Sequence, residues 1–176
     1  MKRIFLIGYM GAGKTTLGKV LARRMGLSYI DTDNYIEKRY HKRISEIFAS
    51  EGEERFRDIE HRILLEVSEF EDIIVSTGGG LPCFNDNMTV MNDLGTTVYL
   101  EASEEELAAR LEISKGTRPI LNNRSGSELV AFIKESLDKR RAFYEKAKIR
   151  FSAEHMYDDN DADILAGRLE ALICKM

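Results

Sequence analysis

Residues 8–16 read GYMGAGKTT, and they directly follow a short apolar run and precede a helical pattern. The stretch matches the phosphate-loop pattern G-x-x-x-x-G-K-[ST] through Gly8, Gly13, Lys14 and Thr15. In such a loop the backbone N–H groups face phosphate oxygens, the lysine reaches the terminal phosphates and the hydroxyl can ligate magnesium. A simple glycine turn is the alternative, but the flanking strand and helix favour a nucleotide site.

Short apolar runs alternate with longer helical patterns along the whole chain. We expect strands at residues 3–8, 28–31, 73–77 and 96–101, and a weaker one at 149–153, because these runs are rich in β-branched and aromatic residues. Strands that alternate with helices predict a parallel sheet covered on both faces. The fold class is therefore α/β.

The length and composition indicate one soluble domain spanning residues 1–176. A chain of 176 residues is long enough for one core and short for two. The net charge of −4 argues against nucleic acid as a partner, and no apolar run approaches the length of a membrane span. Lys14 closes the first apolar run, so we do not expect a secretory leader. With Cys83 and Cys174 as the only cysteines, we expect the cytoplasm.

Several helix ends can be predicted from capping residues. Gly26 suits a left-handed cap after residues 17–25, and Ser103 with Glu106 has the spacing of a capping box. Ser127 is expected to open a helix that runs to about residue 148, and a last helix is expected at 161–175. The irregular stretch between residues 113 and 127 has a length at which function or mobility is common.

A pair of carboxylates follows the second predicted strand. Asp31 and Asp33 would lie beside the phosphate loop, on the same side if the strand continues. One could orient magnesium through water while the other accepts a proton from an attacking hydroxyl. The alternative is that one of them only caps the next helix.

Two further features leave both a structural and a functional interpretation open. Arg57 could bind a substrate carboxylate with its planar fork, or it could form surface salt bridges with its acidic neighbours. The three glycines at residues 78–80 could let a ligand approach the backbone, or they could form a tight turn between strand and helix.

Taken together, the motifs resemble those of shikimate kinases. They occur in the same order over nearly the whole chain: GYMGAGKTTLG, DTDNYIE, ISEIFASEGEERFRDIE, STGGG, TRPIL and KRRAFYEKA. The resemblance implies a three-layer phosphate-loop fold with a five-stranded parallel sheet, a helical substrate-binding section at about residues 32–61 and a mobile lid at about 112–126. It also implies ATP-dependent phosphorylation of the 3-hydroxyl of shikimate, on the pathway to chorismate and aromatic amino acids, by a monomer that uses Mg²⁺.

The resemblance also assigns roles to particular residues. Asp33 resembles the aspartate that holds the ring hydroxyls and acts as the base, while Arg57, Gly79 and Arg140 resemble the residues that bind the shikimate carboxylate. Arg140 is preferred over its neighbour Arg141 because of its Arg-x-x-x-Tyr spacing.

The nucleotide side is implied in the same way. The transferring phosphate would contact Lys14 and Arg118. Mg²⁺ would be held by Thr15 and, through water, by Asp31. Arg110 would lie against adenine. The loop residues expected to bind ATP are Gly11, Ala12, Gly13, Lys14, Thr15 and Thr16. Residues 152–163, SAEHMYDDNDAD, depart from the basic or proline-containing segment that many relatives place beside adenine.

Two rival functions remain at this stage. Another small-molecule kinase of the same fold, such as a gluconate kinase, would share the phosphate loop but not the set formed by Asp33, Arg57 and Gly79. A nucleotide-binding regulator without turnover would be expected to lose Lys14 or Asp33, and both are present.

Overall fold

The computed structural model describes residues 2–114 and 124–175, which form an α/β domain around one parallel sheet. The strands are β1 (Arg3–Ile7), β2 (Ser28–Asp31), β3 (Ile73–Ser76), β4 (Thr96–Glu101) and β5 (Ile149–Ser152). Their order across the sheet is β2-β3-β1-β4-β5, and every neighbouring pair is parallel. All five strands expected from the sequence are present.

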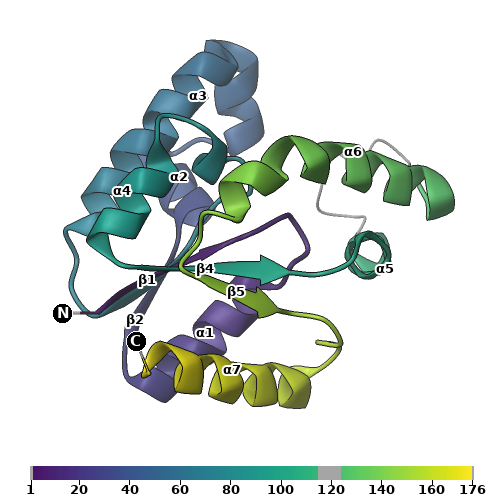
Figure 1. Cartoon of the computed structure of the whole chain (residues 1–176). Coiled ribbons are helices and arrows are strands. Elements are labelled where there is room, and N and C mark those ends of the chain that lie inside the picture. The colour runs from purple at the N-terminus through teal and green to yellow at the C-terminus, as the bar shows by residue number, and fades with distance from the viewer. Residues whose placement is uncertain (1, 115–123, 176) are drawn as a thin grey trace.

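Helices cover both faces of this sheet, as predicted. They are α1 (Lys14–Met25), α2 (Thr32–Tyr40), α3 (Ile44–Ser68), α4 (Asn87–Leu94), α5 (Glu104–Ile113), α6 (Gly126–Tyr144) and α7 (Asp159–Ile173), with a short 3₁₀ helix, η1 (Leu81–Cys83). Helices α1 and α7 pack together on one face, whereas α3, α4 and α6 lie over the other (Figure 1). The fold is the three-layer arrangement that the resemblance to shikimate kinases implies (Figure 1).

The core lies where the central strands meet the apolar sides of the helices. Apart from Arg3, the side chains of β1 and β3 are almost completely buried, as expected for strands covered on both faces. Helix α1 contributes Leu17 and Leu21, and α7 contributes Ala166 and Leu169 to the same side of the sheet. This packing fixes the carboxyl edge of the sheet, from which the functional loops emerge.

Some helix boundaries differ from the sequence prediction. Helix α6 begins at Gly126 with Ser125 as its N-cap residue, and it ends at Tyr144 because the chain then turns to join β5 beside β4. Gly26 does adopt the predicted left-handed cap, with φ of 66°. Helix α3 contains a break that the sequence analysis missed, because Gly52 has φ of 81° and ψ of 172°.

The predicted capping box at α5 is only half formed. The Ser103 hydroxyl accepts a hydrogen bond from the N–H of Glu106 at 3.2 Å, as expected. The reciprocal bond is absent, because the N–H of Ser103 donates to the carboxylate of Glu154 instead. The Glu106 carboxylate is therefore available for other partners.

Candidate active site

The carboxyl edge of the sheet opens into a cleft with a volume of about 750 Å³. Most of the residues predicted to bind nucleotide or substrate line this cleft: Gly11, Gly13, Lys14, Thr15, Thr16, Asp31, Asp33, Arg57, Gly79, Arg110 and Arg140. The phosphate-loop residue Ala12 is buried, and its N–H donates to the Tyr9 carbonyl at 3.1 Å. Arg118 and most of the predicted lid lie outside the described residues.

The phosphate loop joins the end of β1 to the start of α1. Lys14 is the first residue of the helix, and its ammonium group donates to the carbonyls of Gly8 at 2.8 Å and Tyr9 at 2.9 Å. The first N–H groups of a helix have no partners within the helix, and the helix dipole gives this end a partial positive charge. The cleft therefore contains a lysine and a helix N-terminus suited to bind an anion.

Asp31 fulfils the helix-capping role that the sequence left as an alternative. One of its carboxylate oxygens accepts hydrogen bonds from the N–H groups of Asp33 and Asn34, both at 3.1 Å, and so caps α2. The other oxygen accepts the Thr15 hydroxyl at 3.1 Å. The capping and metal-site interpretations are thus compatible. The strand ends at Asp31 and α2 begins at Thr32, so the condition that the strand continues through Asp33 is not met.

The three glycines after β3 approach three charged residues in turn. A Cβ atom added at Gly78 would lie 2.6 Å from Asp33 Oδ1, and one at Gly80 would lie 2.6 Å from Arg57 Nη1. A Cβ atom at Gly79 would lie 3.3 Å from Arg140 Nη1. A side chain at Gly78 or Gly80 would force the carboxylate or the guanidinium group to move, whereas one at Gly79 would make only a tight contact. The loop also turns directly into η1. The tight turn and the close approach of a ligand to the backbone are therefore compatible interpretations.

Arg57 is held in place rather than exposed on the surface. Its guanidinium group donates to Glu60 at 2.6 Å and to Glu53 at 2.9 Å, and its side chain is only 14% exposed. The guanidinium carbon also lies 4.2 Å from the centre of the Phe84 ring. The salt bridges foreseen from the sequence therefore fix an arginine that still lines the cleft.

Glu60 is a site residue that the sequence analysis missed. Its side chain is 2% exposed, and burial raises its pKa from the ordinary value of 4.5 to about 7, although the Arg57 guanidinium opposes the shift. The nearby carboxylate of Asp33 raises the pKa further. Its spacing of three residues from Arg57 on a helix was the available signal.

Arg140 and Arg141 point to different surroundings, although they are adjacent in the sequence. Arg140 lines the cleft, with its guanidinium carbon 5.5 Å from the centre of the Tyr9 ring. Arg141 donates instead to Glu104 at 3.1 Å. Tyr144, one turn after Arg140, donates its hydroxyl to the Gly79 carbonyl at 2.6 Å and so ties α6 to the glycine loop.

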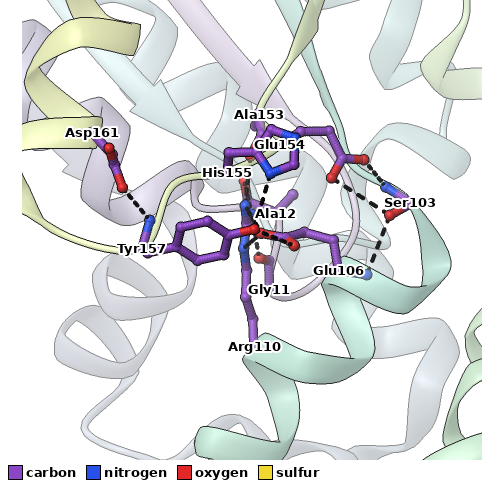
Figure 2. A network of polar contacts seen from close by, with 10 residues as sticks. All are labelled: Gly11, Ala12, Ser103, Glu106, Arg110, Ala153, Glu154, His155, Tyr157 and Asp161. Carbon is purple, nitrogen blue, oxygen red and sulfur yellow. Dashed lines mark hydrogen bonds and ion pairs between the residues drawn. The ribbon is translucent and has the colours of Figure 1, made fainter.

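Helix α5 and the segment that follows β5 bound the part of the cleft beside the phosphate loop. Arg110 of α5 hydrogen-bonds to the carbonyls of Gly11 and Ala153 (Figure 2). Met156, Tyr157, Asp158 and Asp159 line this part, so the acidic segment that departed from the expected pattern does reach the cleft beside the phosphate loop. No local pattern predicts this approach, because it depends on the path of β5.

A helix N-terminus suited to bind an anion and a pair of arginines thus share one cleft with the carboxylate of Asp33. That combination defines a phosphate-loop phosphotransferase with a small-molecule acceptor. The family model for shikimate kinase matches residues 10–169, and the chain belongs to the shikimate kinase family.

Individual relatives agree with this assignment. A shikimate kinase from Parabacteroides distasonis is 61% identical over 98% of this chain and all of that relative. The crystal structure of a shikimate kinase from Bacteroides thetaiotaomicron superposes with a TM-score of 0.95 at 47% identity, covering 99% of both chains. A shikimate kinase from Acinetobacter baumannii, solved in complex with shikimate, gives a TM-score of 0.85 at 31% identity, covering 99% of this chain and 94% of the other.

Proposed function

We propose that this chain transfers the terminal phosphoryl group of ATP to the 3-hydroxyl of shikimate, in the pathway to chorismate and aromatic amino acids. Family membership supports the reaction. The observation that carries the residue assignment is the glycine loop, where three successive residues approach Asp33, Arg140 and Arg57 beside the phosphate loop. A gluconate kinase or a regulator without turnover has no comparable support.

The shikimate carboxylate would bind between Arg57 and Arg140, next to the Gly79 backbone. Two guanidinium groups can hold one carboxylate through charge-assisted hydrogen bonds. Glu60 and Phe84 fix the orientation of Arg57, and the hydroxyl of Tyr144 holds Gly79. The acceptor site would therefore be preorganised, which lowers the cost of ordering side chains on binding.

Asp33 would bind the ring hydroxyls and accept the proton of the attacking 3-hydroxyl. Its backbone is fixed by the cap that Asp31 provides, and Gly78 is held next to it by a hydrogen bond from its N–H to Thr32 Oγ1 at 3.0 Å. A carboxylate in hydrogen-bond reach of a hydroxyl can both orient it and take up its proton. Because phosphoryl transfer has a loose transition state, orientation contributes alongside basicity.

The ATP phosphates would bind to residues 11–16, with the Lys14 ammonium on the transferring group. Lys14 now donates to two carbonyls of its own loop, so binding would exchange these hydrogen bonds for phosphate oxygens. Arg110 would contribute at the base end of the nucleotide. Arg118 would stabilise the charge that develops during transfer, as part of a lid at about residues 112–126.

The residues around Thr15 fit a magnesium ion. The Thr15 hydroxyl and the Asp31 carboxylate are oxygen donors in contact with each other, and Mg²⁺ prefers oxygen ligands while keeping several waters. In sites where phosphates are transferred, Mg²⁺ is commonly held by one or two protein groups together with the substrate phosphates. The ion would neutralise charge on the phosphates.

We also propose that residues 1–176 form one domain that acts as a monomer in the cytoplasm, with residues 32–61 as the substrate-binding section. Helix α2 and the first part of α3 occupy that section, and they carry Asp33 and Arg57. None of the described helices has the length and apolar character needed to cross a membrane.

The proposed function is tested by a coupled assay of ADP release in the presence of Mg²⁺. Shikimate, quinate and gluconate are supplied in turn as acceptors, and Lys14→Ala serves as the inactive control. We expect ADP release that depends on shikimate and on Lys14. Equal rates with gluconate, or without any acceptor, would contradict the proposal.

A further inference from the structure

The guanidinium group of Arg110 connects three separate parts of the chain. Its Nη2 atom donates to the Ala153 carbonyl at 2.6 Å, and Nη1 lies 3.3 Å from the Gly11 carbonyl and 3.5 Å from that of Ala12. Both Nε and Nη2 also donate to the carboxylate of Glu106, which lies one turn earlier on α5 (Figure 2). Arg110 thus joins α5, the phosphate loop and the chain after β5.

Glu106 determines the orientation of this guanidinium group. A single oxygen, Oε1, accepts from Nε at 3.1 Å and from Nη2 at 2.7 Å. Both side chains are largely shielded, with Arg110 14% and Glu106 12% exposed, so the pair is screened less than a surface pair. The second oxygen of Glu106 accepts the Tyr157 hydroxyl at 3.3 Å. The capping bond that Glu106 was expected to make to Ser103 is made by Glu154 instead.

The carbonyls that Arg110 approaches belong to the peptides that form the phosphate loop. Within a planar trans peptide the C=O and the following N–H point in opposite directions. The position of the Ala12 carbonyl beside Arg110 therefore also fixes the direction of the Gly13 N–H. That N–H is one of the donors a phosphate loop uses to bind an anion.

The segment after β5 holds the same loop from another side. A Cβ atom added at Gly13 would lie 2.1 Å from the terminal methyl of Met156, and Gly13 has φ of 93°, where glycine is favoured. Met156 thus packs directly against the loop. Its neighbour Tyr157 contacts Glu106 and is held at its own N–H by Asp161 (Figure 2).

We infer that Glu106 is a positioning residue for nucleotide binding, which acts by orienting Arg110 against the phosphate loop. It would not touch ATP itself. Loss of Glu106 would release the guanidinium group from α5 and loosen its hold on the loop carbonyls. The inference rests on the proposed nucleotide site, and it predicts a loss of nucleotide affinity without a loss of shikimate affinity.

The test compares binding of ADP with Mg²⁺ and binding of shikimate, each by isothermal titration calorimetry. Glu106→Ala should weaken ADP binding about tenfold, the size expected for loss of a charge-assisted hydrogen bond. The shikimate Kd should stay within about twofold of the wild-type value, because Arg57 and Arg140 are untouched. Glu106→Gln keeps an acceptor oxygen for Arg110, so it should retain most of the affinity, with a loss of about threefold.

Glu135→Gln is the matched control, since Glu135 forms an ion pair of the same spacing with Lys139 at 2.8 Å on the exposed face of α6. It should leave both affinities unchanged. In an Arg110→Ala background, Glu106→Ala should cause no further loss of ADP affinity, because Glu106 acts through Arg110.

Three results would overturn the inference. The first is an ADP affinity equal to that of the wild type in folded Glu106→Ala. The second is an equal loss of ADP affinity in Glu106→Ala and Glu106→Gln. The third is a further tenfold loss of ADP affinity when Glu106→Ala is added to Arg110→Ala. Failure of the wild-type protein to bind ADP would instead contradict the nucleotide site itself, and with it the role given to Glu106.

Discussion

Replacing Glu60 with glutamine should change how the stability of the protein depends on pH. Glu60 is almost completely buried, and burial raises its pKa to about 7 despite the Arg57 guanidinium at 2.6 Å. Glutamine has nearly the same shape and keeps an oxygen that can accept from Arg57. The variant therefore removes the proton equilibrium while leaving the packing almost intact.

The direction follows from the raised pKa. In the unfolded chain Glu60 ionises near 4.5, whereas in the folded protein it retains its proton up to about pH 7. The folded state thus binds more protons in this interval, and the free energy of unfolding falls as pH rises through it. The stabilisation is fully present below pH 4.5 and is lost above pH 7. A pKa difference of this size corresponds to about 3 kcal/mol at 1.36 kcal/mol per pH unit.

Urea unfolding followed by circular dichroism at several pH values between 5 and 8.5 provides the assay. The free energy of unfolding of Glu60→Gln, relative to wild type, should rise by up to about 3 kcal/mol across this range. Glu53→Gln is the control, because Glu53 binds the same guanidinium group but is 60% exposed. Its difference from wild type should change by less than about 1 kcal/mol. A pH-independent difference between Glu60→Gln and wild type would show that folding does not raise the pKa of Glu60.

Five further substitutions test the site by steady-state kinetics and shikimate titration. Lys14→Ala should lower kcat at least about a hundredfold with an unchanged circular dichroism spectrum, and more than a tenth of wild-type kcat would remove Lys14 from the chemistry. Asp33→Asn should lower kcat at least about a hundredfold and raise the shikimate Kd less than tenfold; the reverse pattern would make Asp33 a binding residue only. Arg118→Ala should lower kcat roughly 10³-fold with little effect on shikimate affinity, and weakened shikimate binding at normal kcat would contradict the lid role. Arg140→Ala should raise the shikimate KM more than about tenfold, whereas Arg141→Ala should change it less than twofold, and equal effects would undo the choice between them.

The strands could be predicted because their signals are local. Each run of β-branched and aromatic residues is long enough for one buried strand, and all five formed where expected. Helix ends were less certain because neighbouring residues compete for the same role. Ser125 rather than Ser127 precedes α6, and a distant residue, Glu154, took the bond expected from Glu106.

The candidate site was predicted to the extent that motif spacing determines it. The cleft contains Lys14, Asp33, Arg57 and Arg140, which come from separate motifs but meet at one edge of the sheet. The contacts that orient these residues were not predictable in the same way. The packing of Met156 on the phosphate loop depends on how far β5 carries the chain, and no local pattern encodes that path.

The proposed reaction transfers the ATP γ-phosphoryl group to one particular hydroxyl of shikimate. The most direct test is to incubate the protein with ATP, Mg²⁺ and shikimate and to locate the phosphate in the product by phosphorus–proton correlation NMR. We expect one molecule of ADP for each phosphorylated shikimate, with the phosphate on the 3-hydroxyl. Phosphate on a different hydroxyl would contradict the proposed reaction. Release of ADP and inorganic phosphate without any phosphorylated shikimate would contradict it as well.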